Sequence, residues 1–162
     1  MLSGVVVSLY MELELPYDTD ARVQLAEILN DVSSAAISCE SSISPLVQQY
    51  KQTSLQHKRS HFVHLIENQY QRALRGCCPA EMLLPCVDFM THLALCDINL
   101  YCVDADYGFT MYLHVKTVKA VCDLREMLRS YQLNRLLENM FSAFSAFPNI
   151  SGQLEYQLVS SR

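Results

Sequence analysis

Glycine is scarce in this chain of 162 residues, which has only four, and they do not cluster. Loops that cradle phosphate groups with consecutive backbone N–H groups depend on clustered glycines, so nucleotide-dependent enzymes are disfavoured. No stretch approaches the ~18 apolar residues that a membrane helix needs. The first residues also lack the basic segment that opens a signal peptide. These absences predict an intracellular protein, in the nucleus or the cytoplasm, with no membrane partner.

Charge is also sparse and unevenly distributed. Charged residues make up 18% of the chain, against about 25% in a typical domain. The net charge is −5, and the segments 1–45, 46–75, 76–114 and 115–162 sum to −6, +4, −5 and +2. A net negative chain is a poor general ligand for nucleic acid. Alternating blocks of opposite charge favour association between copies, so we expect a homo-oligomer.

The seven cysteines include no C-x-x-C pair. An odd number without an export signal predicts reduced thiols inside a cell. Structural zinc requires two ligand pairs at suitable spacing, so Cys77, Cys78 and Cys86 are interpreted as small buried hydrophobic residues. We therefore expect no metal and no cofactor. A small thiol- or metal-dependent enzyme that uses Cys77, Cys78 or Cys122 is the alternative.

Three segments show the alternation of a β-strand with one buried face. They are residues 3–15, a hairpin over 98–115 with Gly108 in its turn, and 152–159. Helical spacing of apolar residues predicts the remaining elements, except for the serine-rich stretch 33–45, which is interpreted as a mobile loop. The predicted helices cover residues 20–32, 46–75, 79–96 and 117–146, the last broken near 130–132.

This order of elements predicts a single domain over residues 1–162, of the α+β class. With right-handed crossovers the simplest arrangement is a two-layer sandwich. It would have a four-stranded antiparallel ferredoxin-type sheet, helices on one face and an extra helical insertion.

A basic surface is predicted on the helix over 46–75. Three histidines, His57, His61 and His64, follow the i, i+4, i+7 spacing of one helical face. Positively charged side chains next to the histidines would repel a metal ion, so we interpret this surface as a solvated face. A contact with phosphate or with an acidic partner is the alternative. The candidate residues of this basic face are His57, Lys58, Arg59, His61, Arg72 and Arg75.

Aromatic residues near the end of the last helix are candidate anchors for a protein partner. Met140, Phe141, Phe144 and Phe147 exceed what one core-facing stripe requires, although this spacing is also typical of core. His114 and Cys122 lie near the junction of a strand and a helix. The helix dipole lowers a thiol pKa mainly within the first turn of a helix. Cys122 lies beyond that turn, so no catalytic residue is assigned.

Two segments resemble known families. The segment "GFTMYLHVKTVKAVCDL" resembles part of the adenovirus early region four nuclear scaffold protein. That resemblance implies a viral early protein that self-assembles and captures host regulatory proteins, with the helices over 46–96 as an insertion. The segment "CDLREMLRSYQLNRLLENMFSAFSAFPNISGQLEYQLVSS" is similar in layout to the N-terminal domain of the tumour-necrosis-factor-receptor death-domain adaptor. That likeness implies a signalling module that binds a trimeric partner.

Taken together, these observations predict a non-enzymatic protein-interaction or scaffold module that docks protein partners at a strand edge or a helix face. A signalling adaptor of the death-receptor type is one alternative, and the small enzyme is another.

Overall fold

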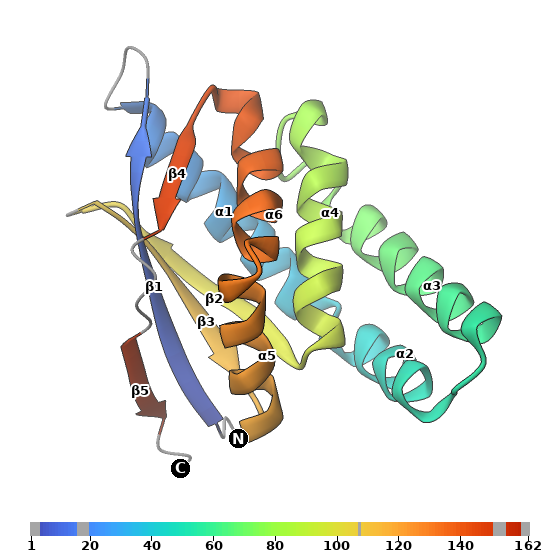
Figure 1. Cartoon of the computed structure of the whole chain (residues 1–162). Coiled ribbons are helices and arrows are strands. Elements are labelled where there is room, and N and C mark those ends of the chain that lie inside the picture. Colours follow the sequence, from blue (N-terminus) through green and yellow to red (C-terminus); the bar gives the residue numbers. More distant parts are fainter. Residues whose placement is uncertain (1–3, 16–19, 107, 151–154, 160–162) are drawn as a thin grey trace.

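The computed structural model describes residues 4–15, 20–106, 108–150 and the backbone of 155–159. This part of the chain contains six α-helices and an antiparallel sheet, which confirms the predicted α+β class (Figure 1). No helix in it is long and apolar enough to cross a membrane. The helices are α1 (Asp20–Ser38), α2 (Glu40–Gln52), α3 (Gln56–Leu74), α4 (Ala80–Leu95), α5 (Val118–Arg129) and α6 (Gln132–Phe141), followed by a short 3₁₀ turn (Ser142–Phe144). The strands are β1 (Gly4–Glu14), β2 (Ile98–Asp104), β3 (Phe109–Val115), β4 (Phe147–Ile150) and β5 (Glu155–Val159).

The long first strand, β1, lies inside the sheet, whose strand order is β2-β3-β1-β4. On one side it pairs with β3, from Val5 opposite Val115 to Met11 opposite Phe109. On its other side it pairs with β4 and β5 at different levels. The strand predicted over 152–159 corresponds to β5, and residues 152–154 lie outside the described residues. The short strand β4 is an element that the alternation did not predict.

Strand alternation sets the buried face of the sheet. Val7, Leu9 and Met11 of β1 are fully buried, and the residues between them are partly or fully exposed. Their β3 partners Leu113 and Phe109 are buried as well. Burying this row of apolar side chains beneath the helices is the main favourable contribution to folding. One continuous hydrophobic core includes residues of all six helices.

The serine-rich stretch 33–45 is helical, so the prediction of a mobile loop there is wrong. Helix α1 continues to Ser38, and after a turn at Cys39 helix α2 begins. The physical reason is the position of Ser33, which is only 2% exposed. Its hydroxyl donates to the carbonyls of Leu100 and Tyr101 in β2, at 2.8 and 2.9 Å. A serine that satisfies a neighbouring strand does not compete with its own helix backbone.

The same contact covers the outer edge of β2. The Asn30 side chain accepts from the Val103 backbone N–H at 2.8 Å and donates to the Val103 carbonyl at 2.9 Å. Together with Ser33 it occupies backbone groups that an added strand would need. These contacts leave fewer free backbone groups at the β2 edge for an added strand.

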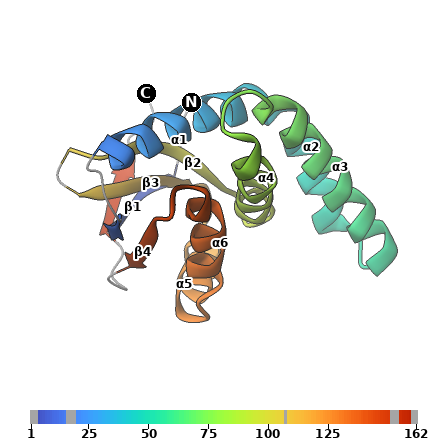
Figure 2. The same ribbon diagram turned by 90° about the horizontal axis from the view of Figure 1, so that it is seen from above.

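The helix predicted over 46–75 is two antiparallel helices. Helix α2 ends at Gln52, Thr53 is extended, and α3 begins at Gln56. The α2–α3 hairpin projects away from β1 and β4 in both ribbon views (Figures 1 and 2). Further along the chain, α5 and α6 are separated at Ser130 and Tyr131, which is the predicted position of the break. Tyr131 adopts the left-handed conformation with φ 62°.

Candidate functional site

The α2–α3 hairpin is tied to the sheet by polar contacts at both ends of α2. Near its start, Glu40 Oε1 accepts from Lys116 Nζ at 2.6 Å and from Asn99 Nδ2 at 3.0 Å. Near its end, Lys51 forms an ion pair with Asp97. These contacts join α2 to the segments that flank β2 and β3. They fix the hairpin's direction relative to the sheet, so the surface that the hairpin presents is a defined one.

The Glu40 cluster has the electrostatics of an anchor. The hydrogen bond from Lys116 holds the pKa of Glu40 below its ordinary value, with help from Asn99 and from the charge of His114, while partial burial opposes the shift. His114 itself is only 6% exposed. The adjoining cavity measures about 30 Å³, room for about one water molecule. A substrate does not fit beside these groups, so we assign them a structural role.

The inner face of α3 packs against the body. Ile66, Tyr70 and Leu74 are buried there, and burial raises the pKa of the Tyr70 hydroxyl. Arg59 also lies toward the interior of the hairpin. Its guanidinium lies 5.1 Å from the centre of the Tyr50 ring, and its Nε donates to the Thr53 carbonyl at 3.1 Å. Arg59 thus joins α2 to α3, and its assignment to the exposed basic face is wrong.

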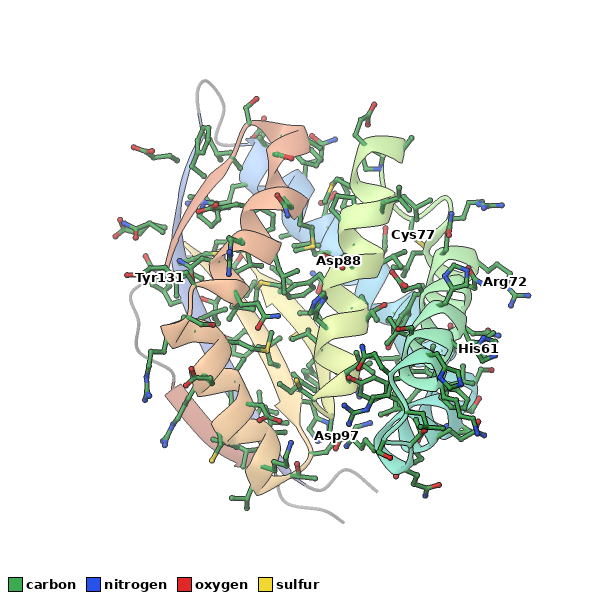
Figure 3. The ribbon with its side chains drawn as sticks, turned by 45° about the vertical axis from the view of Figure 1, so that its right-hand side comes forward. His61, Arg72, Cys77, Asp88, Asp97 and Tyr131 are labelled. Atoms are coloured by element: carbon green, nitrogen blue, oxygen red, sulfur yellow. The ribbon has the colours of Figure 1, made fainter. Side chains whose placement is uncertain are left out.

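The outer face of α3 carries the other predicted basic residues, and all of them are exposed. His61 and Arg72 point away from the body in the side-chain view (Figure 3). Their spacing places them on one face of the helix, because residues three, four, seven or eight apart lie above one another. His64 shares this face. We call the set the basic stripe: His57, Lys58, His61, His64, Arg72 and Arg75.

The cationic charge of the basic stripe is uncompensated. Within the described ranges, no ion pair involves Lys58, Arg72 or Arg75, whereas Lys51 and Lys116 each have a carboxylate partner. No group of three or more potential metal ligands occurs among the residues that the structure describes. His57 and His64 are seven residues apart, about 10 Å along the helix, so they do not share one ion. The stripe is therefore an exposed cationic surface of the described part of the chain.

The aromatic anchors predicted near the end of the chain divide into two groups. Met140 and Phe141 are fully buried, and Phe141 forms an edge-on contact with Phe109 at 5.5 Å between ring centres. Their prediction as partner anchors is wrong, because α6 turns this face toward the sheet. Phe144 packs partly against the core. Phe147 on β4 is 62% exposed and remains accessible to a partner.

A groove of about 630 Å³ lies between the hairpin, α4 and α5. Its size is in the range of small-molecule sites, and its lining combines apolar surface with the charged side chains of Lys51, Arg59, Lys119, Asp123 and Glu126. Several of its charges are already paired, as in the contact of 3.2 Å between Lys119 and Asp123. The lining residues are Tyr50, Lys51, Arg59, His92, Leu95, Cys96, Lys119, Asp123, Glu126, Met127 and Gln132. We assign no ligand to this groove.

The thiols offer little support for nucleophilic catalysis. Burial raises the pKa of Cys86, which is fully buried, and of its neighbour Cys78. A raised pKa lowers the fraction of thiolate, which is the reactive form. Cys122 is exposed on α5, whereas His114 is buried beside the Glu40 cluster. The cysteine and histidine near the strand–helix junction thus lie in different environments.

An acidic surface on α1 went unnoticed in the sequence. Asp20, Glu27 and Asp31 are all exposed, and their spacings of seven and four residues place them on one helical face. We call these three residues the acidic stripe. In the part of the chain that the structure describes, neither Glu27 nor Asp31 takes part in an ion pair. The helical spacing of the carboxylates was the available signal, since all three lie within the helix predicted over 20–32.

Comparison of the chain with protein-family models, with curated protein sequences and with solved structures found no match in any of the three.

Proposed function

We propose that this chain is a non-enzymatic protein-interaction module that contacts acidic protein surfaces through the basic stripe. One observation carries the proposal. The stripe lies on the exposed side of a projecting hairpin, and its Lys58, Arg72 and Arg75 have no ion-pair partner among the described residues. Uncompensated charge on a fixed surface steers a partner of opposite charge and selects its orientation.

The rest of the molecule favours a protein partner over nucleic acid. The chain has a net charge of −5, and exposed carboxylates on α1 and at the ends of β1 and β2 would repel phosphates. A sequence-independent nucleic-acid site usually combines a wide basic groove with exposed aromatic rings. The stripe is a single helix face, and its residues include no Phe, Tyr or Trp; its rings are the imidazoles of His57, His61 and His64.

A scaffold role is the wider form of this proposal. It would combine self-association with the capture of regulatory proteins, as the resemblance to the adenoviral scaffold protein implies. The strand order β2-β3-β1-β4 with helical crossovers supports a ferredoxin-type sheet. Seven unpaired thiols support a site of action inside the cell, in the nucleus or the cytoplasm. The signalling-adaptor alternative predicts a trimeric partner and is tested by the same capture experiment.

Affinity capture from a cell lysate with three immobilised proteins tests the proposal. The first is wild type, and the second is the double variant Arg72→Glu/Arg75→Glu. The third is Arg135→Glu, a matched control because Arg135 is an exposed arginine of α6 outside the stripe. Circular dichroism first establishes that all three are folded. We expect proteins retained by wild type and Arg135→Glu to be lost from the double variant. Retention of the same proteins by all three would contradict the proposal.

A further inference from the structure

Two exposed helical faces of opposite charge occur in this one chain. The basic stripe lies on α3 and the acidic stripe lies on α1, and neither face is covered by another element among the described residues. In a single copy the two stripes do not meet, because Ile66, Tyr70 and Leu74 turn the opposite face of α3 inward and Leu25, Leu29 and Val32 do the same for α1. Each stripe is therefore accessible to another molecule.

The acidic stripe matches the last part of the basic stripe in length. Asp20 and Asp31 are eleven positions apart on α1, and His64 and Arg75, the residue that follows the end of α3, are also eleven positions apart. At about 1.5 Å per position, each segment is about 16 Å long. With the helices side by side and parallel, and Asp31 opposite Arg75, Arg72 lies within one position of Glu27. This register places the two cations at the end of α3 near the two carboxylates in the middle of α1.

We propose that the basic stripe of one molecule docks on the acidic stripe of a second copy of this chain. The inference rests on the proposed function, since it names the acidic protein surface that the stripe contacts. A second copy is the occupant that the structure supports, because the complementary charges and the two segments of eleven positions belong to this chain. An unrelated acidic protein would meet the charge requirement alone.

An apolar side chain within the acidic stripe supplies contact area that the charges lack. Exposed ion pairs contribute little to affinity and mainly set rate and specificity. Val23 lies between Asp20 and Glu27 on α1 and is 45% exposed. Its burial between copies would contribute attraction, while the charges fix the pairing of α3 with α1.

The test uses complementary charge reversals. The variant Arg72→Glu/Arg75→Glu has two acidic helix faces, and Glu27→Lys/Asp31→Lys has two basic ones. Sedimentation velocity at low ionic strength measures the average mass of each protein across a concentration series. We expect the wild-type mass to rise with concentration and to fall back as salt screens the charges. Each variant alone should associate about 100-fold more weakly, and an equimolar mixture of the two variants should recover association. Arg135→Glu is the control and should behave as wild type.

Three results would overturn the inference. They are a wild-type protein that stays monomeric at every concentration, reversal variants that associate as tightly as wild type, and a mixture that fails to recover association. The proposed function is tested separately by the capture experiment. If wild type is monomeric while Arg72→Glu/Arg75→Glu still loses its captured proteins, self-docking is wrong and recognition of acidic proteins stands. If association depends on both stripes but capture is unchanged in every variant, the stripe serves only pairing of copies.

Discussion

Replacing Asn30 by leucine tests whether α1 covers the sheet edge as described. In the native protein the Asn30 side chain pairs with both backbone groups of Val103, at 2.8 and 2.9 Å. Leucine has a similar size but neither donates nor accepts a hydrogen bond. The Val103 N–H and C=O would then lose their partners at a site that is largely shielded, since Val103 is 6% exposed. The change therefore isolates the contribution of this polar contact.

The expected loss of stability follows from two opposing terms. A neutral hydrogen bond contributes about 0.5–1.5 kcal/mol net, so two of them contribute about 1–3 kcal/mol. Leucine is a better helix former than asparagine by about 0.5 kcal/mol, which offsets part of the loss. The unfolding free energy should fall by about 0.5–2.5 kcal/mol. In a domain of this size that corresponds to a decrease in Tm of about 1–10 °C.

Urea denaturation followed by circular dichroism measures this difference directly. The matched control is Gln24→Leu, which introduces the same side chain at an exposed position of the same helix. It should change stability by less than about 0.5 kcal/mol. A stability of Asn30→Leu within that range of wild type would refute the edge-covering role, provided that the slope of the transition is unchanged.

Three further predictions concern the anchor, the core and the thiols. The hydrogen bond from Lys116 lowers the pKa of Glu40 in the folded protein, so the ionised carboxylate stabilises the native state at pH values above its unfolded pKa, and this stabilisation is lost as the pH falls through the folded pKa. Glu40→Gln should therefore reduce the loss of stability at acidic pH in a profile of stability against pH. An acidic loss equal to that of wild type would contradict the anchoring role of Glu40. In urea denaturation, Phe141→Ala should lower the unfolding free energy by about 3–5 kcal/mol, whereas Phe147→Ala should change it by less than about 0.5 kcal/mol. Equal losses for the two variants would contradict the buried position of Phe141 and the exposed position of Phe147. When the native protein is alkylated and then analysed by mass spectrometry, the fully buried Cys86 should remain unmodified until the protein is denatured. Rapid modification of Cys86 in the native state would support the alternative of a thiol-dependent enzyme.

Strands β1, β2 and β3 were predictable because their alternating pattern fits a strand that buries one face. The alternation of Val7, Leu9 and Met11 with more polar residues is compatible with a strand that buries one face, and the register with β3 follows from burying Phe109 and Leu113 on that face. The break between α5 and α6 was predictable from length, since one rod would exceed the domain.

The elements that could not be predicted depend on distant partners. Nothing local marks Ser33 as a residue that will donate to β2, which lies 67 positions further along the chain. Serines favour turns when their hydroxyls bond to their own backbone, and here a remote carbonyl takes that role. The turn at Thr53 likewise has no glycine or proline signal. It is supported by Arg59, whose side chain reaches back to the Thr53 carbonyl and the Tyr50 ring.

The basic stripe shows that the buried apolar residues of a helix determine which of its charged residues are exposed. Which residues of a helix are exposed depends on which face is buried, and in α3 that face is set by Ile66, Tyr70 and Leu74. Arg59 lies seven residues before Ile66 and therefore shares the inner face, while His64 does not. The predicted basic face was chosen from the spacing of the histidines and the cations beside them, so it included Arg59. A charged residue can be assigned to a docking surface only after the apolar residues that orient its helix have been identified, and this order holds for the acidic stripe of α1 as well.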